Sequence, residues 1–148
     1  MLSKIIQTLS PAETEAAGAA LAAEMREGKL PPYVALYGDL GVGKTAFVRG
    51  FASVITPNAP VRSPTFALVN EYRGRDISLF HFDMYRITGE DDLYSIGYDD
   101  YLTKNGICLV EWSENIPNDI PQHHVRVEIV KDNAALPDSR RITIEERW

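Results

Sequence analysis

The chain has 148 residues, and its 15 lysines and arginines against 21 aspartates and glutamates give a formal net charge of −6. This length, with 45% hydrophobic and 24% charged residues, is typical of an ordinary globular protein, so we expect one domain over residues 1–148 rather than a disordered chain. The acidic isoelectric point, near 5.0, argues against direct binding to a nucleic-acid backbone, because that mode of binding requires a basic face.

The first predicted element is a helix that begins after Ser10. Ser10 at the N-cap, Pro11 at the first helical position and Glu13 at the third form a capping-box pattern. An alanine-rich run over residues 14–27 continues the helical pattern, and Gly28 is suited to the turn that ends it.

A strand, a glycine-rich turn and a second helix come next, over residues 33–37, 38–43 and 44–54. Further strands are expected at residues 66–72, 77–83, 107–112, 125–130 and 141–145, with a short helix at 90–96. A strand that leads into a helix, followed by more apolar strands, predicts an α/β fold. We expect a mostly parallel central sheet flanked by helices, with antiparallel strands late in the chain.

The strongest functional signal lies in residues 38–45, GDLGVGKT, which fit the phosphate-binding pattern G-x-x-x-x-G-K-[ST] at every fixed position. The glycines allow the backbone to curl, so that several N–H groups and the N-terminus of the following helix point at one anion. Lys44 would supply a positive charge to the β- and γ-phosphates, and the Thr45 hydroxyl would ligate Mg²⁺. The sequence therefore predicts a P-loop that binds a nucleoside triphosphate.

Two apolar runs end in acidic residues, Asp83 and Glu111, that could complete such a site. Ligands gather at the carboxyl ends of strands in open α/β sheets, so either carboxylate could hold Mg²⁺ or orient the attacking water. His81 shares a strand face with Asp83 by alternation. We interpret His81 as a hydrogen-bonded structural histidine in preference to a catalytic base.

Ser63 and Thr65 lie between the P-loop helix and the next strand. P-loop switch proteins place there a hydroxyl that senses the γ-phosphate, although a simple proline turn explains the pattern equally well.

The sequence contains no Asn-Lys-x-Asp element that would select guanine, so ATP is the preferred nucleotide. An arginine that speeds hydrolysis could be Arg49, Arg62 or Arg86, or it could come from a partner protein. If a partner supplies it, the isolated chain hydrolyses ATP slowly.

The remaining reactive side chains favour structural roles. Cys108 lies in an apolar run, which predicts a buried, inert thiol, and His123 and His124 follow a proline in a loop, where we expect surface positions rather than a metal site. The first residues do not form a secretory signal, and no apolar run approaches the roughly 18 residues that span a membrane. A cytoplasmic location is therefore expected.

Four segments, GDLGVGKT at residues 38–45, SPTF at 63–66, HFDMYR at 81–86 and LVEW at 109–112, closely resemble the bacterial TsaE (YjeE) family in order and spacing. The resemblance extends from residue 10 to about residue 144. It implies a P-loop ATPase needed for threonylcarbamoylation of adenosine 37 in tRNA. In that family the protein acts with the TsaD–TsaB pair, so tRNA would be reached only through the complex.

The resemblance also implies roles for single residues. Lys44 would bind phosphate and take part in catalysis, Thr45 and Glu111 would hold Mg²⁺, and Asp83 would serve both hydrolysis and metal positioning. Ser63 and Thr65 would belong to a switch-like loop. The implied nucleotide contacts are Gly38, Asp39, Leu40, Gly41, Val42, Gly43, Lys44, Thr45, Ala46, Thr14, Trp112 and Arg140.

Two alternatives remain open on the sequence. A small P-loop kinase acting on a metabolite or nucleoside fits the length, although Arg140 and Arg141 are the only late basic pair that could serve an arginine-rich lid. The second alternative is a nucleotide-dependent binding switch that hydrolyses ATP at a negligible rate.

Overall fold

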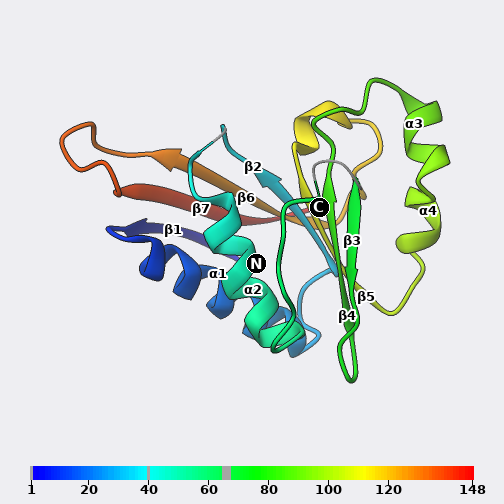
Figure 1. Ribbon diagram of the computed structural model, residues 1–148, viewed down its shortest axis with the longest axis horizontal. Coiled ribbons are helices and arrows are strands. Elements are labelled where there is room, and N and C mark those ends of the chain that lie inside the picture. The colour runs from blue at the N-terminus through cyan, green and yellow to red at the C-terminus, as the bar shows by residue number, and fades with distance from the viewer. Residues whose placement is uncertain (1, 40, 65–67) are drawn as a thin grey trace.

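A seven-stranded mixed sheet forms the centre of the structure (Figure 1), a computed structural model that describes residues 2–39, 41–64 and 68–148. The strands follow the order β1-β7-β6-β2-β5-β4-β3 across the sheet. The four central strands, β6, β2, β5 and β4, are parallel, whereas β3, β7 and β1 pair antiparallel with their neighbours. The strands are β1 (Ser3–Thr8), β2 (Tyr33–Tyr37), β3 (Val69–Tyr72), β4 (Ser78–Asp83), β5 (Gly106–Glu111), β6 (His124–Lys131) and β7 (Arg140–Arg147).

The burial of each strand explains its place in the sheet. Every residue of β5 is buried, as are four of the five residues of β2, and near-continuous apolar runs of this kind belong in the middle of a parallel sheet. In β6 and β7 the buried residues alternate with more exposed ones, so these strands pack only one face against the core.

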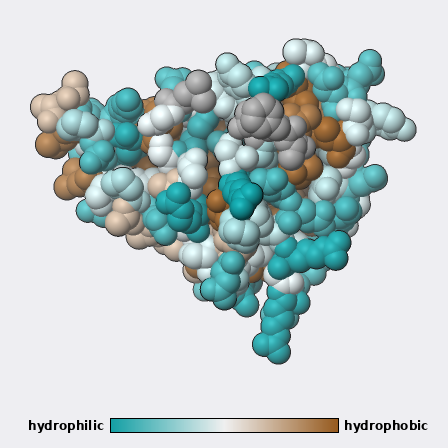
Figure 2. All heavy atoms as spheres, viewed as in Figure 1, coloured by the Kyte–Doolittle hydropathy of each residue, from teal (hydrophilic) through white to brown (hydrophobic). Residues whose placement is uncertain are grey.

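Helices cover the two faces of the sheet unequally. The long helices α1 (Pro11–Arg26) and α2 (Lys44–Ile55) lie side by side (Figure 1) and share a hydrophobic core with Val34 and Leu36 of β2. The short helices α3 (Glu90–Ser95) and α4 (Tyr98–Tyr101) contribute to a second core with Tyr33 and Ala35, which point to the opposite face. Trp112 and Ile116, on either side of the 3₁₀ turn η1 (Ser113–Asn115), also belong to this core. On the surface shown in Figure 2, hydrophilic residues are widespread and hydrophobic residues appear in smaller, separate areas.

The predicted α/β architecture is confirmed, and the first helix begins where its capping pattern places it. Ser10 Oγ accepts a hydrogen bond of 3.2 Å from Glu13 N. The Glu13 carboxylate accepts a bond from Leu9 N, one residue earlier than in a standard capping box. Gly28 adopts φ = 79° just beyond the helix, as expected of a glycine that ends one.

Three of the described elements were not predicted from the sequence: the edge strand β1, the short helix α4 and the 3₁₀ turn η1. β1 carries little local signal, since Ile5 in its centre is exposed and the strand exists by pairing with β7 from the other end of the chain. The strand expected at residues 66–72 starts at Val69 in the described part, and residues 66 and 67 of that prediction lie outside the described residues. β6, expected among late antiparallel strands, pairs antiparallel with β7 and parallel with β2.

Cys108 lies in the fully buried strand β5, as predicted, and burial raises the pKa of its thiol to about 12. A thiol with this pKa stays protonated at neutral pH and is a poor nucleophile. Among the described helices, none combines the length and the hydrophobicity that crossing a membrane would take.

Helices α1 and α2 approach each other at two glycines. A Cβ atom added to Gly50 would lie 1.7 Å from the carbonyl oxygen of Glu15, and one added to Gly18 would lie 2.1 Å from that of Phe47. Only glycine permits this backbone contact, because no side chain can give way there. The crossing fixes the position of α2, whose N-terminus follows the phosphate-binding segment.

We expect Gly50→Ala to lower the free energy of unfolding by about 1–3 kcal/mol, as overpacking in a closely fitted core does. In an open helix the same change would instead stabilise the protein, by up to about 1 kcal/mol. Thermal or urea unfolding of the variant measures the effect. Gly89→Ala is the control, since nothing lies within 4 Å of an added Cβ there. Equal stability of Gly50→Ala and the parent chain would contradict the crossing.

Candidate nucleotide-binding site

The predicted P-loop connects the end of β2 to the start of α2, and its glycines are required by the backbone. Gly38, Gly41 and Gly43 have φ angles of 154°, 78° and 102°, which residues with a side chain rarely adopt. An added Cβ on Gly38 would also lie 2.9 Å from the carbonyl oxygen of Ile129 on β6. Leu40, predicted as a nucleotide contact, lies outside the described residues.

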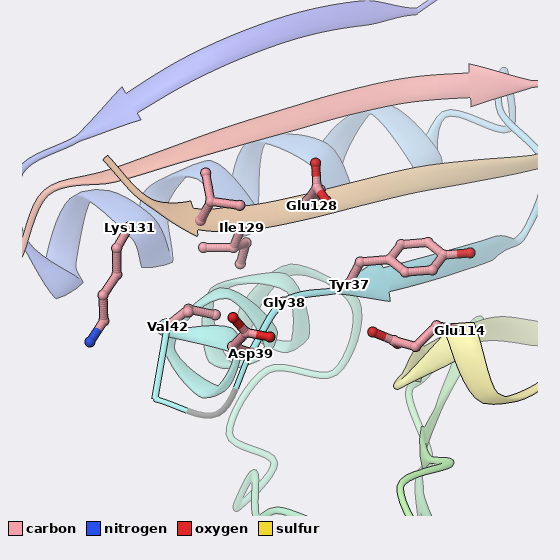
Figure 3. A pocket seen from close by; sticks show the side chains of 9 residues that line it. Tyr37, Gly38, Asp39, Val42, Glu114, Glu128, Ile129 and Lys131 are labelled. Carbon is pink, nitrogen blue, oxygen red and sulfur yellow. The ribbon is translucent and has the colours of Figure 1, made fainter. Parts of the chain in front are cut away.

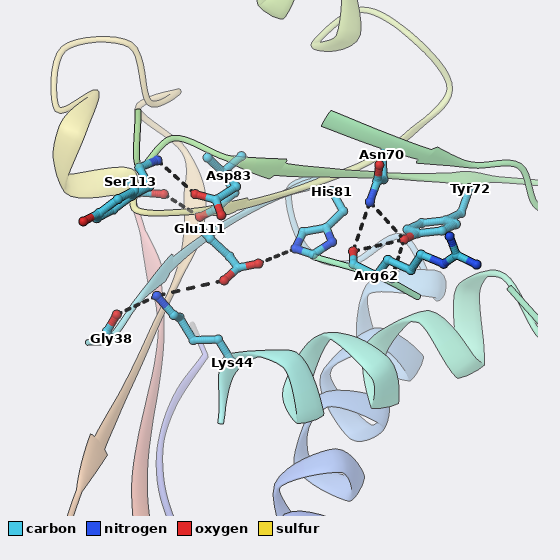
Figure 4. A network of polar contacts seen from close by, with 11 residues as sticks. Gly38, Lys44, Arg62, Asn70, Tyr72, His81, Asp83, Glu111 and Ser113 are labelled. Atoms are coloured by element: carbon cyan, nitrogen blue, oxygen red, sulfur yellow. Dashed lines mark hydrogen bonds and ion pairs between the residues drawn. The ribbon is translucent and has the colours of Figure 1, made fainter. Parts of the chain in front are cut away.

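Lys44, the first residue of α2, turns its ammonium group across this loop (Figure 4). Nζ donates a 2.7 Å hydrogen bond to the carbonyl oxygen of Gly38 and lies 3.9 Å from Glu111 Oε1. It also lies 4.3 Å from the centre of the Trp112 ring, a distance suited to a cation–π contact. The side chain is only 6% exposed, so its charge acts in a largely desolvated setting.

A cavity of about 360 Å³ opens beside Lys44 and brings the predicted residues together. Its lining comes from the P-loop, the start of α2, the segment before β3 and the ends of β4 and β5. The residues are Gly41, Gly43, Lys44, Thr45, Ser63, Asp83, Glu111 and Trp112. Thr65, the second hydroxyl of the predicted switch-like loop, lies outside the described residues.

The two acidic residues of the cavity stand at the ends of neighbouring parallel strands. Asp83 ends β4 and Glu111 ends β5, and the strand register pairs them directly. Each is 7% exposed. Burial, reinforced by the charge of Glu111, raises the pKa of the Asp83 carboxyl, while the bond that its Oδ1 accepts from Tyr85 N acts in the opposite direction. Protonation of Asp83 is therefore easier than for a carboxyl in water.

The donor set of this cavity fits a magnesium ion. Two carboxylates and the Thr45 hydroxyl line it, and Mg²⁺ prefers oxygen ligands and is usually held by one or two carboxylates together with phosphate and water. In the described parts of the chain, no group of three or more His, Cys, Asp or Glu side chains is arranged to hold a metal by itself. The arrangement therefore fits an ion that arrives with a nucleotide better than a resident structural metal.

A second cavity of about 530 Å³ lies on the other side of the P-loop. Gly38, Asp39 and Val42, three predicted nucleotide contacts, line it together with residues of β2, β6 and η1. Figure 3 shows Lys131 and Glu114 toward opposite ends of this cavity. The loop thus presents different residues to the two cavities. Ala46, also predicted as a contact, is buried within α2.

Thr14 and Arg140 occupy different positions relative to the loop. Thr14 is buried, its hydroxyl lies 2.8 Å from that of Thr8, and its methyl group would lie 3.9 Å from a Cβ atom added to Gly43 of the loop. Arg140 contacts the loop directly, since Nε donates a 2.7 Å hydrogen bond to the carbonyl oxygen of Val42. Contact of either residue with a nucleotide stays a prediction.

Two side chains of β3 that the sequence analysis did not identify hold the segment that leads to Ser63. The Tyr72 hydroxyl accepts a 2.9 Å hydrogen bond from Arg62 N, and Asn70 Nδ2 donates to Arg62 O at 3.0 Å (Figure 4). Their spacing of two residues, which places both on one strand face, is the signal that could have indicated a shared role.

The candidate arginines of the chain do not appear in the described lining of the 360 Å³ cavity. Arg49 instead lies 3.6 Å from Glu15 on α1. The described site thus offers Lys44 as the cation next to both carboxylates.

We expect Asp83→Asn to raise the melting temperature of the nucleotide-free protein at pH 7. A carboxyl whose pKa is higher in the folded than in the unfolded state opposes folding once it is ionised, and this penalty disappears as the pH falls through the raised pKa. The gain should be about 2–4 °C per kcal/mol relieved and should shrink toward pH 4. Asp138→Asn, on an exposed loop, is the control. A gain that grows on acidification would refute the assignment.

Comparisons with known proteins agree with this geometry. The family model for "Threonylcarbamoyl adenosine biosynthesis protein TsaE" matches residues 8–142. A Bacillus subtilis protein named tRNA threonylcarbamoyladenosine biosynthesis protein TsaE is 38% identical over 137 residues, which cover 93% of this chain and 82% of the relative. The Treponema pallidum protein of the same name is 33% identical over 111 residues, covering 75% and 79%.

The fold is shared with a solved structure as well. The crystal structure of Bacillus subtilis YdiB superimposes with a TM-score of 0.75 at 31% sequence identity, covering 99% of this chain and 87% of that one. With the sheet order, the P-loop and the paired acids in place, the family match over nearly the whole length leads to one conclusion: the chain belongs to the TsaE family of tRNA threonylcarbamoyladenosine biosynthesis proteins.

Proposed function

We propose that this chain is a Mg²⁺-dependent ATPase that acts with TsaD and TsaB in the threonylcarbamoylation of adenosine 37 of tRNA. The observation that carries the proposal is the single cavity lined by Lys44, Thr45, Asp83 and Glu111. A cation, a hydroxyl and two carboxylates at a helix N-terminus are the groups that phosphoryl transfer from a nucleotide uses.

Nucleotide binding changes the partners of Lys44. Its ammonium group is held by the Gly38 carbonyl and the Glu111 carboxylate, and phosphate oxygens would take over these contacts. The N–H groups of the P-loop and the start of α2 would surround the β-phosphate. Trp112 stacks over the same ammonium group and would exclude water from that side.

Asp83 and Glu111 would divide the remaining work. Bound Mg²⁺ supplies positive charge to the phosphate oxygens and fixes their geometry. Thr45 and Glu111 would hold the ion. Asp83 accepts a hydrogen bond from Tyr85 N at Oδ1, and its other oxygen, Oδ2, would orient the attacking water or a water ligand of the metal.

The charge and the described arginine positions support action through partners. A net charge of −6 suits a subunit that does not itself hold tRNA. Since no arginine lies in the described lining of the cavity, we infer that hydrolysis is slow in the isolated protein and that the TsaD–TsaB pair accelerates it.

We expect Lys44→Ala to weaken ADP and ATP binding by about 10- to 150-fold, the loss that follows removal of a charged hydrogen bond worth about 1.5–3 kcal/mol. Isothermal titration calorimetry measures it. Lys104→Ala is a matched control, because Lys104 also stacks on an aromatic ring, Tyr101 at 4.2 Å, but lies outside the cavity lining. Unchanged affinity in Lys44→Ala would exclude the P-loop as the nucleotide site.

We expect the TsaD–TsaB pair to raise the rate of ATP turnover by about tenfold or more, as arginine supply in trans does in other P-loop enzymes.

Glu111→Ala should lower the Mg²⁺-dependent rate far more than it weakens ADP binding. Phosphate release assays with and without the pair test both statements. An ATP turnover rate that TsaD and TsaB do not change would contradict the proposed function. Transfer of the γ-phosphoryl group to a metabolite faster than to water would instead favour the alternative function, a P-loop kinase.

A further inference from the structure

A buried histidine lies directly behind the acidic pair of the cavity. His81, on β4, is 1% exposed and does not belong to the described lining of the cavity. Its Nε2 lies 2.5 Å from Glu111 Oε2 on β5. The strand register pairs Glu111 with Asp83 and His81 with Leu109. The Glu111 side chain therefore points toward the preceding residues of the strands, where it contacts the imidazole.

The Glu111 carboxylate is thereby held at both oxygens. Oε2 contacts His81 and Oε1 faces Lys44 at 3.9 Å, as the chain of dashed lines in Figure 4 shows. A carboxylate fixed in this way cannot rotate freely about its last bond. Its orientation toward the cavity is set by the histidine on one side before any ligand enters.

The surroundings of Nδ1, the second ring nitrogen of His81, indicate which tautomer of the imidazole contacts Glu111. His81 Nδ1 is buried and has no hydrogen-bond partner in the described part of the structure. A hydrogen placed on Nδ1 would bury an unpaired donor and would leave Nε2 with no hydrogen to donate to the carboxylate. The tautomer with its hydrogen on Nε2 avoids that donor and gives Glu111 a hydrogen bond to accept.

We propose that His81 is the positioning residue for Glu111: by donating Nε2–H to Oε2 it fixes the carboxylate with Oε1 toward the cavity and so sets the affinity of the site for Mg²⁺. The inference rests on the proposed Mg²⁺–nucleotide site. Outer partners that orient metal-binding side chains typically contribute about 10- to 100-fold to metal affinity or activity. Because His81 is not among the described lining residues of the cavity, it would act on the ion only through Glu111.

Two substitutions separate positioning from simple packing. His81→Phe keeps a buried planar ring and removes the donor. His81→Gln places an amide N–H at about the reach of Nε2, so it should restore the contact. Mg²⁺ affinity is read from calorimetric titration of Mg²⁺ into protein saturated with ADP, and ADP affinity is measured separately in EDTA.

We expect His81→Phe to weaken Mg²⁺ binding by about 10- to 100-fold and to leave ADP affinity in EDTA within about twofold, whereas His81→Gln recovers most of the Mg²⁺ affinity. The matched control is His123→Phe, which breaks a second histidine–glutamate pair, at 2.7 Å to Glu146 and outside the cavity lining. It should change neither affinity. If His81→Phe does not unfold cooperatively, and is therefore not properly folded, His81→Gln is compared with His81→Asn instead. The asparagine side chain is shorter, so only the glutamine variant should preserve Mg²⁺ affinity.

The outcomes distinguish a failure of the role of His81 from a failure of the proposed nucleotide site. Parent protein that binds ADP and Mg²⁺, with His81→Phe binding Mg²⁺ equally well, would overturn the role of His81 alone. Equal losses of ADP affinity in EDTA for the phenylalanine and glutamine variants would also overturn it, because they indicate a packing role. Parent protein that binds no ADP would overturn the proposed function itself, and the positioning role with it.

Discussion

Three parallel strands that end at one edge of the sheet are the constraint on which the site depends. β2 runs into the P-loop, and β4 and β5, in register, end at Asp83 and Glu111. The register of β4 against β5 sets Asp83 beside Glu111, and a shift of β4 by one residue would turn Asp83 to the opposite face of the sheet from Glu111. The two-glycine crossing of α1 and α2 then holds Lys44 opposite the pair.

This arrangement concentrates charge where the protein is least able to solvate it. Two carboxylates and one ammonium group are more than nine-tenths buried around the cavity. The imbalance is negative, and burial raises the pKa of Asp83 accordingly. A site of this kind is stabilised by a divalent cation, while a nucleotide alone would add further negative charge. Metal and nucleotide are therefore expected to bind together, each favouring the other.

Local features were predicted from the sequence more readily than neighbours in space. The α1 cap at Ser10 and the glycines of the P-loop depend on a few consecutive residues, and the apolar runs indicated β2 and β5 directly. The contact of His81 with Glu111 required knowing that β4 and β5 are adjacent, which periodicity does not specify. The same holds for Arg140 on Val42, which joins residues 98 positions apart. β1 was not predicted because it is stabilised by pairing with β7, which is distant in the sequence, and local patterns do not reveal such a partner.

The pairing of β1 with β7 bears on the order in which a newly made chain can assemble. β1 leaves the ribosome before β7 but cannot pair with it until β7 has also been translated, and contacts this distant in sequence form slowly. Arg140, at the start of β7, also supports the P-loop through Val42. A nascent chain that already contains the whole nucleotide motif would thus lack one of the loop's supports until Arg140 has also emerged from the ribosome.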